Sequence, residues 1–322
     1  RRQRQMCIRD RCKSMGKELA GFADIFEEAD LDMLVLLGDR FEIQMAAVAA
    51  MLYRIPVAHI HGGELTQGLM DDAIRHSVTK MSDLHFTSTS EYAQRVIQMG
   101  EQPERVFCVG ALGIENIKSI RLLSREQLCQ KFGDIFLHNY IMVTYHPVTL
   151  EKHTAGIQFQ KLLNVVENHP EYHYIFTYAN ADTDGAIINK MIESYTQEHK
   201  NTKAFVSMGQ LGYLSALQHC SAVLGNSSSG IIEAPSFHIP TINIGDRQKG
   251  RVRAKTVIDC GYETRDIEQA LTESQNQKFK DLCQESTNPY EGKNTSEQII
   301  MQIKKYLNQV QGKQKIFYDI EV

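Results

Sequence analysis

The chain lacks the features that mark several common classes of protein. Its 322 residues carry 35 lysines and arginines against 39 aspartates and glutamates, so no basic field exists to attract nucleic acid. No hydrophobic run approaches the roughly 20 residues of a membrane-spanning helix, and the longest, residues 45–52, suits a buried helix. Neither a nucleic acid nor a membrane is therefore expected as a partner.

Cysteine is sparse and follows no pattern. The seven cysteines are scattered, odd in number and contain no CxxC pair, which argues against a disulfide framework and a structural zinc site. The basic residues 1–12 do not begin with Met, and no hydrophobic stretch of a signal peptide follows them. We expect free thiols, a cytoplasmic location, and neither a metal nor a cofactor.

The sequence does contain short hydrophobic runs that alternate with helix-length stretches such as 41–54 and 156–169. Strands are predicted within 32–39, 55–63, 83–89, 105–110, 140–147, 173–180, 202–207, 221–226 and 240–245. Such strands joined by helical crossovers form parallel sheets that are covered on both faces. Nine strands are too many for one compact sheet, and the polar stretch 123–139 suggests a linker. The predicted fold class is α/β, with two Rossmann-like, doubly wound domains and a cleft between them.

Polar residues follow these predicted strands, at the edge where open parallel sheets bind their ligands. The segment GNSSSG, residues 225–230, would place backbone N–H groups and hydroxyls at a helix start, which suits a phosphate or diphosphate. No lysine follows its second glycine, so it is not a P-loop. Glu233 could accept hydrogen bonds from ribose hydroxyls. The alternative is an ordinary Ser/Asn turn with a helix cap.

A second group of polar residues lies in the first half of the chain. Asp39 and Arg40 follow a strand, either as site residues or as a surface ion pair. In HIHGGE, residues 59–64, two glycines allow a tight turn that brings His61 and Glu64 together.

Further titratable residues extend this group. Asp71 and Asp72 open a helix, as site residues or as caps, with Arg75 and His76 on adjoining faces. A metal site is the weaker interpretation, because no HExxH spacing is present. His146, at the end of a later strand, is either structural or an acid–base group.

Five motifs in order carry a resemblance to a known family. They are GDRFE, AHIHGGE, DDAIRHSVTKMSDLHF, TYHPVT and GNSSSGIIEAPSFHIPTINIGDRQKGR. Together they resemble the UDP-N-acetylglucosamine 2-epimerase family, most closely the hydrolysing bacterial branch that feeds sialic-acid and related nonulosonic-acid synthesis. The similarity runs from about Lys13 to the closing KIFYDI.

The resemblance implies a glycosyltransferase-B arrangement and a homodimer. It places an N-terminal domain at 1–137, a nucleotide-binding domain at 138–300, and a C-terminal helix at 301–322 that packs back on the first domain. In the family, a strand, a glycine-rich turn with an arginine, and a further strand and helix precede the residues that match 13–26. We therefore expect the N-terminal sheet to lack its first strand.

The resemblance also implies an elimination followed by an addition. A base removes the C2 proton while the nucleoside diphosphate leaves C1, and water then adds to the 2-acetamidoglucal with inversion at C2. The products are N-acetylmannosamine and UDP. By resemblance the catalytic residues are Asp39, His61, Glu64, Asp71, Asp72 and His146, with His61 replacing a glutamate of some relatives. The substrate-binding residues are Arg40, Asn180, Asp182, Asn226, Ser227, Ser228, Ser229, Glu233 and Arg251.

Three alternatives remain open at this point. They are a non-hydrolysing 2-epimerase, a glycosyltransferase of the same fold, and an inactive nucleotide-sugar binder. HIHGGE and NSSSG favour the hydrolysing branch, because non-hydrolysing relatives tend to have a Glu-Ala-Gly turn and a Ser-Gly-Gly loop. UDP-N-acetylglucosamine is the default substrate, whereas near relatives use GDP-linked or bacillosamine-type sugars.

Overall fold

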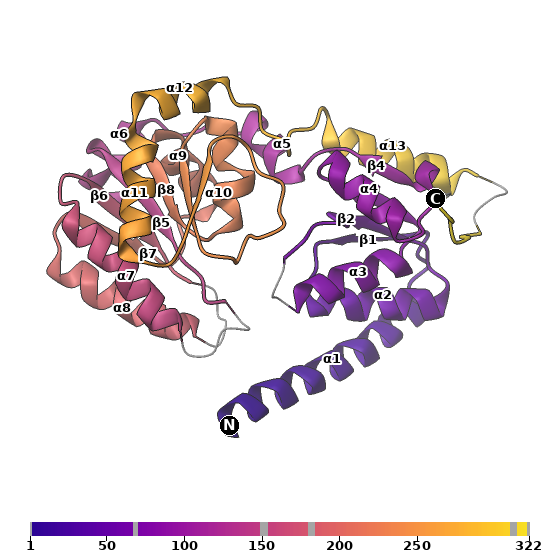
Figure 1. The fold of residues 1–322 in the computed structure, drawn as a ribbon. Coiled ribbons are helices and arrows are strands. Elements are labelled where there is room, and N and C mark those ends of the chain that lie inside the picture. The colour runs from indigo at the N-terminus through magenta and orange to yellow at the C-terminus, as the bar shows by residue number, and fades with distance from the viewer. Residues whose placement is uncertain (1, 67–69, 149–153, 180–183, 310–313, 321–322) are drawn as a thin grey trace. The chain divides into compact units, whose positions relative to one another are not determined.

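The computed structural model describes the backbone of residues 2–66, 70–148, 154–179, 184–309 and 314–320, with side chains from residue 9 onward (Figure 1). The chain divides into two compact units. The first comprises Arg1–Leu65, Met70–Glu115 and Gly292–Val322, and the second comprises Thr66–Leu69 and Asn116–Glu291. Apart from residues 66–69, the chain leaves the first unit at residue 116 and returns to it at residue 292.

Four parallel strands in chain order form the sheet of the first unit. They are β1 (Leu34–Leu37), β2 (Val57–Ile60), β3 (Leu84–Thr87) and β4 (Val106–Cys108). The crossovers are the helices α2 (Phe41–Tyr53), α3 (Asp71–Met81) and α4 (Ser90–Gln98), as parallel neighbours require. His59 pairs with Leu36 on one side and with His85 on the other, so the carboxyl ends of these three strands lie together.

Hydrophobic clusters join different helices to this sheet. One cluster packs α1 (Arg2–Glu28), α2 and α3 around strand residues such as Leu36. The other brings Ile299 and Tyr306 of α13 (Thr295–Leu307) against strand residues such as Phe86. Figure 1 shows α2 and α3 on one side of β1 and β2 and α13 on the other. The last helix is thus part of the first unit's core.

Six parallel strands form the sheet of the second unit, in the order β10-β9-β8-β5-β6-β7. They are β5 (Tyr140–Thr144), β6 (His173–Thr177), β7 (Thr202–Phe205), β8 (Ala222–Gly225), β9 (Thr241–Ile244) and β10 (Val257–Cys260). The strand order reverses between β5 and β8, where Thr144 pairs with Gly225. Open α/β sheets bind their ligands at such a reversal.

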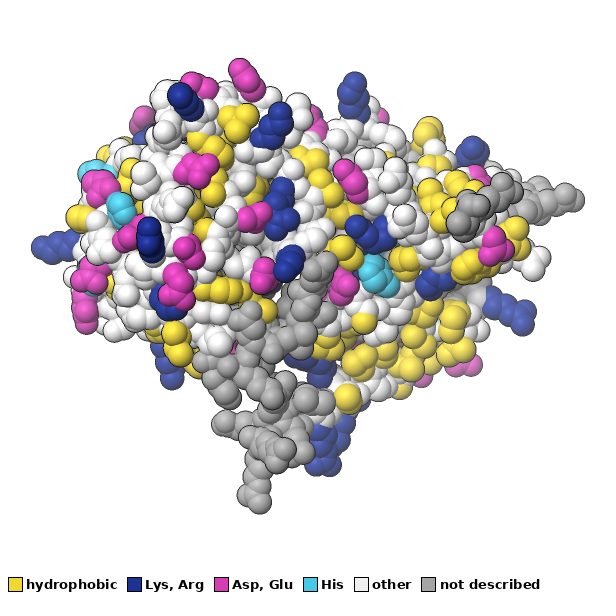
Figure 2. Space-filling view, in the orientation of Figure 1, with side chains coloured by type: hydrophobic (Ala, Val, Ile, Leu, Met, Phe, Trp, Pro, Cys, Tyr) yellow, Lys and Arg dark blue, Asp and Glu magenta, His cyan; other side chains and the backbone are white. Residues whose placement is uncertain are grey.

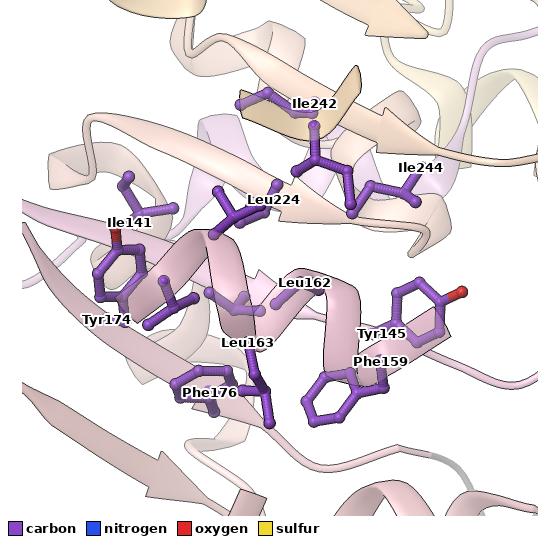
Figure 3. Packing of buried hydrophobic residues seen from close by; sticks show 14 of the residues in the cluster. Ile141, Tyr145, Phe159, Leu162, Leu163, Tyr174, Phe176, Leu224, Ile242 and Ile244 are labelled. Carbon is purple, nitrogen blue, oxygen red and sulfur yellow. The ribbon is translucent and has the colours of Figure 1, made fainter. Parts of the chain in front are cut away.

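The core of the second unit lies between its sheet and the helices beside it. Figure 3 shows α7 (Ala155–Asn168) placing Phe159, Leu162 and Leu163 against the side chains of the strands. The remaining helices are α5 (Leu112–Ser119), α6 (Arg125–Phe132), α8 (Gly185–Glu198), α9 (Gly209–His219), α10 (Ser228–Ile232), α11 (Thr264–Gln275) and α12 (Gln277–Glu285). Short 3-10 turns are η1 (Pro103–Arg105), η2 (Asp134–Leu137) and η3 (Ala234–Phe237).

The predicted α/β fold with two parallel sheets is confirmed, and each predicted strand is present. Reversal of strand order is seen in the second sheet, whereas the described strands of the first run in chain order. The predicted linker at 123–139 is wrong. These residues form α6 and η2, and Leu128 and Phe136 are fully buried in a core cluster of the second unit. β10 is a further strand that the sequence analysis does not predict.

One face of the first unit is hydrophobic at its surface. Figure 2 shows hydrophobic side chains gathered where Figure 1 places α1 and α2. The large exposed hydrophobic residues of these helices are Ile25, Met51, Leu52 and Tyr53. No helix among the described residues combines the length and hydrophobicity that crossing a membrane requires.

Candidate active site

The predicted catalytic residues of the first unit gather at the carboxyl edge of its sheet. Asp39 follows β1, His61 and Glu64 follow β2, and Asp71 and Asp72 form the first turn of α3. Such an edge collects loops from neighbouring strands, which explains how residues 39 and 72 come to lie close together.

Arg75 connects these carboxylates. Its side chain is 2% exposed, and its Nη2 donates to the carboxylate of Asp39. Its Nη1 donates to the carbonyl oxygen of Glu64 at 2.8 Å and contacts Asp72 Oδ1 at 3.5 Å. A buried guanidinium is planar and permanently charged, so its hydrogen bonds fix the orientation of the groups that accept them. Arg75 therefore holds three of the predicted site residues.

His61 and Glu64 form a hydrogen-bonded pair. His61 Nδ1 lies 2.9 Å from Glu64 Oε1, and the hydroxyl of Ser88 donates to the same oxygen at 2.9 Å. Glu64 is buried, whereas the side chain of His61 is 19% exposed. An ionised carboxylate only accepts hydrogen bonds, so it holds the proton of His61 on Nδ1 and leaves Nε2 as an acceptor. This is how an orienting carboxylate prepares an imidazole to act as a base.

The turn that carries this pair is sterically fixed. His61 has φ 68°, a left-handed conformation that is uncommon for a residue with a side chain. Gly63 has φ 77°, and a Cβ atom there would collide with the carbonyl oxygen of Tyr92. Arg95 donates a hydrogen bond to the carbonyl oxygen of Gly63. Unfavourable backbone conformations held in this way often occur at functional sites.

His59 and His76 have other surroundings. His59 is fully buried, and its Nε2 lies 2.8 Å from the carbonyl oxygen of Gly38 and its Nδ1 3.1 Å from Thr79 Oγ1. Burial lowers its pKa to about 3, so it is a neutral structural residue. Burial also lowers the pKa of His76, whose Nε2 lies 3.7 Å from Asp72 Oδ2.

Arg40 lies at the exposed N-cap position of α2. Its Nε lies 3.2 Å from Glu42 Oε2 and its side chain is 70% exposed, so Arg40 forms a surface ion pair with Glu42.

A cavity of about 410 Å³ lies in the second unit, at the ends of β5, β6 and β7 and beside the serine loop. Its lining includes Thr144, His146, Thr177, Tyr178, Val206, Ser207, Met208, Gly209, Gln210, Tyr213, Leu214, Ser227, Ser229 and Glu233. The cavity therefore adjoins the reversal of strand order. Its lining combines hydroxyl groups with hydrophobic side chains, as small-molecule sites commonly do.

The serine loop forms a helix cap as well as part of this cavity. Ser227 is the N-cap of the short helix α10, and its Oγ accepts from the N–H of Ser229 at 3.3 Å. Within the described residues, Ser228 Oγ has no hydrogen-bond partner. The predicted anion-binding loop and the alternative of a capped turn therefore describe the same residues.

Ser229 and Glu233 belong to a chain of hydroxyl groups. Tyr213 Oη donates to Ser229 Oγ at 2.8 Å, and Ser229 Oγ in turn donates to the carboxylate of Glu233. Burial raises the pKa of Glu233, against the hydrogen bond from Ser229, which lowers it.

Asn226 joins the loops that follow β5 and β8. It is fully buried, its Oδ1 accepts from the N–H of His146 at 2.7 Å, and its Nδ2 donates to the carbonyl oxygen of His146 at 2.8 Å. Gly225 has φ 141°, and a Cβ atom there would collide with the carbonyl oxygen of Thr144. Asn226 and Gly225 thus fix the backbone of His146 beside the cavity.

His146 itself is 7% exposed, and burial together with the charge of Arg247 lowers its pKa to about 3. Its imidazole is therefore neutral at pH 7. An imidazole with so low a pKa is a weak base, so it is the place of His146 in the cavity lining that makes it a candidate for proton transfer.

Of three further predicted residues, the structure describes only Arg251. Asn180 and Asp182 lie outside the described residues. Arg251 is half-buried in the segment after β9, where its N–H donates to the carbonyl oxygen of Gln248 at 3.2 Å. No group of three or more His, Cys, Asp or Glu side chains in the described part of the chain could hold a metal ion. The cysteines whose side chains are described are all free thiols.

The structure adds Ser88 and Tyr213 to the site and gives Arg75 a role that the sequence does not reveal. Ser88 directly follows β3, so the rule for strand ends could have found it. Arg75 lies one turn after the two aspartates of α3, a helical spacing that predicts contact with Asp72. Its bond to Asp39 and the bond from Tyr213 to Ser229 join separate elements and have no local signal.

Comparison with known proteins gives consistent matches. The sequence profile of the UDP-N-acetylglucosamine 2-epimerase family matches residues 7–304. The chain is 42% identical to polysialic acid biosynthesis protein P7 of Escherichia coli over 308 residues, which is 95% of this chain and 78% of that protein. It is 41% identical to the GDP/UDP-N,N'-diacetylbacillosamine 2-epimerase (hydrolyzing) of Campylobacter jejuni over 270 residues, 84% of this chain and 70% of that enzyme.

Solved structures resemble the fold at much lower sequence identity. The UDP co-structure of Staphylococcus aureus MnaA superposes with a TM-score of 0.78 at 18% identity, covering 91% of this chain and 79% of that one. The Neisseria meningitidis UDP-GlcNAc 2-epimerase bound to UDP-GlcNAc gives a TM-score of 0.76 at 20% identity, covering 90% and 81%. At such identities the likeness is one of fold.

Proposed function

Because the chain belongs to the UDP-N-acetylglucosamine 2-epimerase family, we propose that it is a hydrolysing 2-epimerase of a nucleotide-linked 2-acetamido sugar. The proposed substrate is UDP-N-acetylglucosamine, and the proposed products are N-acetylmannosamine and UDP. The observation that carries the proposal is the His61–Glu64 pair beside the carboxylates that Arg75 holds. A reaction that removes and returns a proton at C2 needs positioned acids and bases of this kind.

The first unit would supply the proton transfers. His61 presents Nε2 as an acceptor and is oriented by the buried Glu64, so it is our candidate for the base at C2. Asp39 and Asp72 pair with Arg75, and with Asp71 they would guide the water that adds to the glucal. Arg40 would contribute positive charge near the leaving diphosphate.

The second unit would hold the nucleotide. Ser227 and Ser228 would donate to the diphosphate, and Glu233 would accept from the ribose hydroxyls at the edge of the cavity. Asn226 would act by fixing His146, which is neutral and could exchange a proton with the substrate. Asn180, Asp182 and Arg251 would add contacts to the sugar nucleotide. We further propose a cytoplasmic homodimer that serves sialic-acid or related synthesis.

A second candidate substrate has a specific observation in its favour. The Campylobacter jejuni relative is described as acting on GDP- or UDP-linked diacetylbacillosamine, and its identity to this chain nearly equals that of the E. coli relative. The hydrolytic reaction would be the same, and only the sugar and base would differ.

Proton NMR in D₂O tests the proposal. The enzyme is incubated separately with UDP-N-acetylglucosamine and with UDP- and GDP-diacetylbacillosamine. Free N-acetylmannosamine deuterated at C2, together with UDP, is the expected outcome. Deuterated UDP-N-acetylmannosamine without free sugar would instead indicate a non-hydrolysing enzyme. If only a bacillosamine substrate is turned over, the proposed hydrolytic reaction stands and the proposed sugar is wrong. If none of the substrates shows deuterium exchange at C2, the proposal is contradicted.

A further inference from the structure

Three side chains from two elements of the second unit share one line of hydrogen bonds. Tyr213 extends from α9, Ser229 lies in α10, and Glu233 directly follows α10. All three line the cavity of the second unit. We propose that Tyr213 is a positioning residue that acts through Ser229 to hold the carboxylate of Glu233 toward the ligand. The identity of that ligand, a nucleoside diphosphate, rests on the proposed function.

The single hydroxyl proton of Ser229 is used within the protein. A hydroxyl group has one proton, and Ser229 gives it to Glu233. The oxygen of Ser229 also accepts from Tyr213 at 2.8 Å. A phosphate oxygen only accepts hydrogen bonds, so Ser229 cannot donate to a diphosphate while this chain of bonds persists. The three serines of the loop are therefore not equivalent.

The other two serines keep their hydroxyl protons. Ser227 Oγ accepts from the N–H of Ser229, which leaves its own proton available. In the described part of the chain, Ser228 Oγ makes no hydrogen bond. Donation to an anion would then fall to Ser227 and Ser228, whereas Ser229 would serve Glu233.

Tyr213 is suited to fix this direction. Burial raises the pKa of its phenol, so it remains a proton donor at neutral pH. The hydrogen bonds run from Tyr213 to Ser229 to Glu233, the order in which an ionised carboxylate at the end of the chain acts as the acceptor. With its single proton given to Glu233, Ser229 holds one oxygen of that carboxylate and leaves the other for a ligand hydroxyl.

A measurement without ligand tests the chain of bonds directly. The carboxyl carbon of Glu233 is titrated by ¹³C NMR in the full chain and in the variants Tyr213→Phe and Ser229→Ala. Both variants should raise the pKa of Glu233, because each weakens the hydrogen bond that favours its charged form. Tyr140→Phe is the matched control, since Tyr140 Oη donates to the carbonyl oxygen of Ala216 on the same helix at 2.7 Å. That control should leave the titration unchanged.

A measurement with ligands tests the division among the serines. Tyr213→Phe and Ser229→Ala should each weaken UDP binding about three- to tenfold, the range for one lost hydrogen bond. Combining them should weaken it no further than the larger single effect, because they belong to one chain of bonds. Tyr213→Phe and Ser229→Ala should each leave the affinity for inorganic pyrophosphate unchanged, whereas Ser228→Ala should weaken the binding of UDP and of pyrophosphate alike. In turnover, Tyr213→Phe should raise KM more than it lowers kcat.

The two experiments separate failure of this inference from failure of the proposed function. An unchanged titration of Glu233 in Tyr213→Phe would overturn the inference. So would a loss of pyrophosphate binding in Ser229→Ala equal to that in Ser228→Ala. If the unmodified chain binds neither UDP nor pyrophosphate, the proposed nucleotide is wrong. A raised pKa of Glu233 in both variants would then still support the chain of bonds.

Discussion

Arg75 is the residue on which the acidic cluster of the first unit depends. Replacing it with Met would leave Asp39 without its buried partner, and removing one member of a buried ion pair destabilises a fold by about 3 kcal/mol. We expect Arg75→Met to lower the free energy of unfolding by that amount and kcat/KM by about 100-fold, because Glu64 and Asp72 lose their orientation. Urea unfolding and steady-state kinetics measure the two effects.

A matched control for that prediction is an ion pair at the surface. Lys161 and Glu263 are 29% and 67% exposed and lie 2.6 Å apart. Lys161→Met should change the stability by less than about 1 kcal/mol, as exposed pairs do. Equal losses of unfolding free energy in Arg75→Met and Lys161→Met would show that burial of the Arg75 ion pair adds nothing to stability.

His59 makes the stability of the first unit depend on pH. Its pKa falls from 6.5 in the unfolded chain to about 3 in the folded one, so between these values the unfolded state binds more protons. The neutral His59 contributes fully to the free energy of unfolding above pH 6.5, and this contribution is lost on acidification. The loss amounts to about 2 kcal/mol at pH 5. His59→Gln should reduce the difference in unfolding free energy between pH 7.5 and pH 5 by that amount. An undiminished difference in urea titrations would contradict this prediction.

Among the elements, α13 offers a comparison between two adjacent residues. Ile299 is 5% exposed and packs in the core of the first unit, whereas Ile300 is 52% exposed. Ile299→Ala should cost about 2–4 kcal/mol, because it leaves a cavity among β2, β3 and the helix. Ile300→Ala should cost less than about 0.5 kcal/mol. Similar losses in thermal unfolding would mean that the helix does not pack as described.

The elements also show what could be read from the sequence. Strands with continuous hydrophobic runs, such as 140–144, are buried on both faces and were predictable. β10 lies at the sheet edge and exposes Asp259, so its pattern resembles that of a loop. In 123–139 a capping box joins Ser124 to Gln127, a local helix signal that its polar composition concealed.

The site was predictable in the same uneven way. Residues in the loops that follow strands, such as Asp39 and Glu64, were found because topology brings strand ends together. The hydrogen bonds among them depend on side-chain directions that no spacing encodes. The proton of Ser229, for example, is directed by Tyr213, which lies 16 residues earlier on another helix.

At the scale of the whole molecule, the two units should respond to different perturbations. A ligand at 100 times its Kd stabilises the unit that binds it by about 2.7 kcal/mol. Hydrogen exchange in the presence of UDP should therefore slow in peptides from 116–291, whereas Ile299→Ala should speed exchange in peptides from the first unit. Equal responses of all peptides to both perturbations would show that the chain unfolds as one cooperative body.

The return of the chain to its first unit has a consequence for its synthesis. The second unit ends at Glu291, whereas the first still needs the residues from Gly292 onward, including α13. The last strand of the first sheet ends at Cys108 and α13 begins at Thr295, so at about 5–20 residues per second the sheet lacks one of its covers for roughly 10–40 seconds of synthesis. During translation the second unit can be complete while the strand residues that α13 covers in the first unit are still exposed.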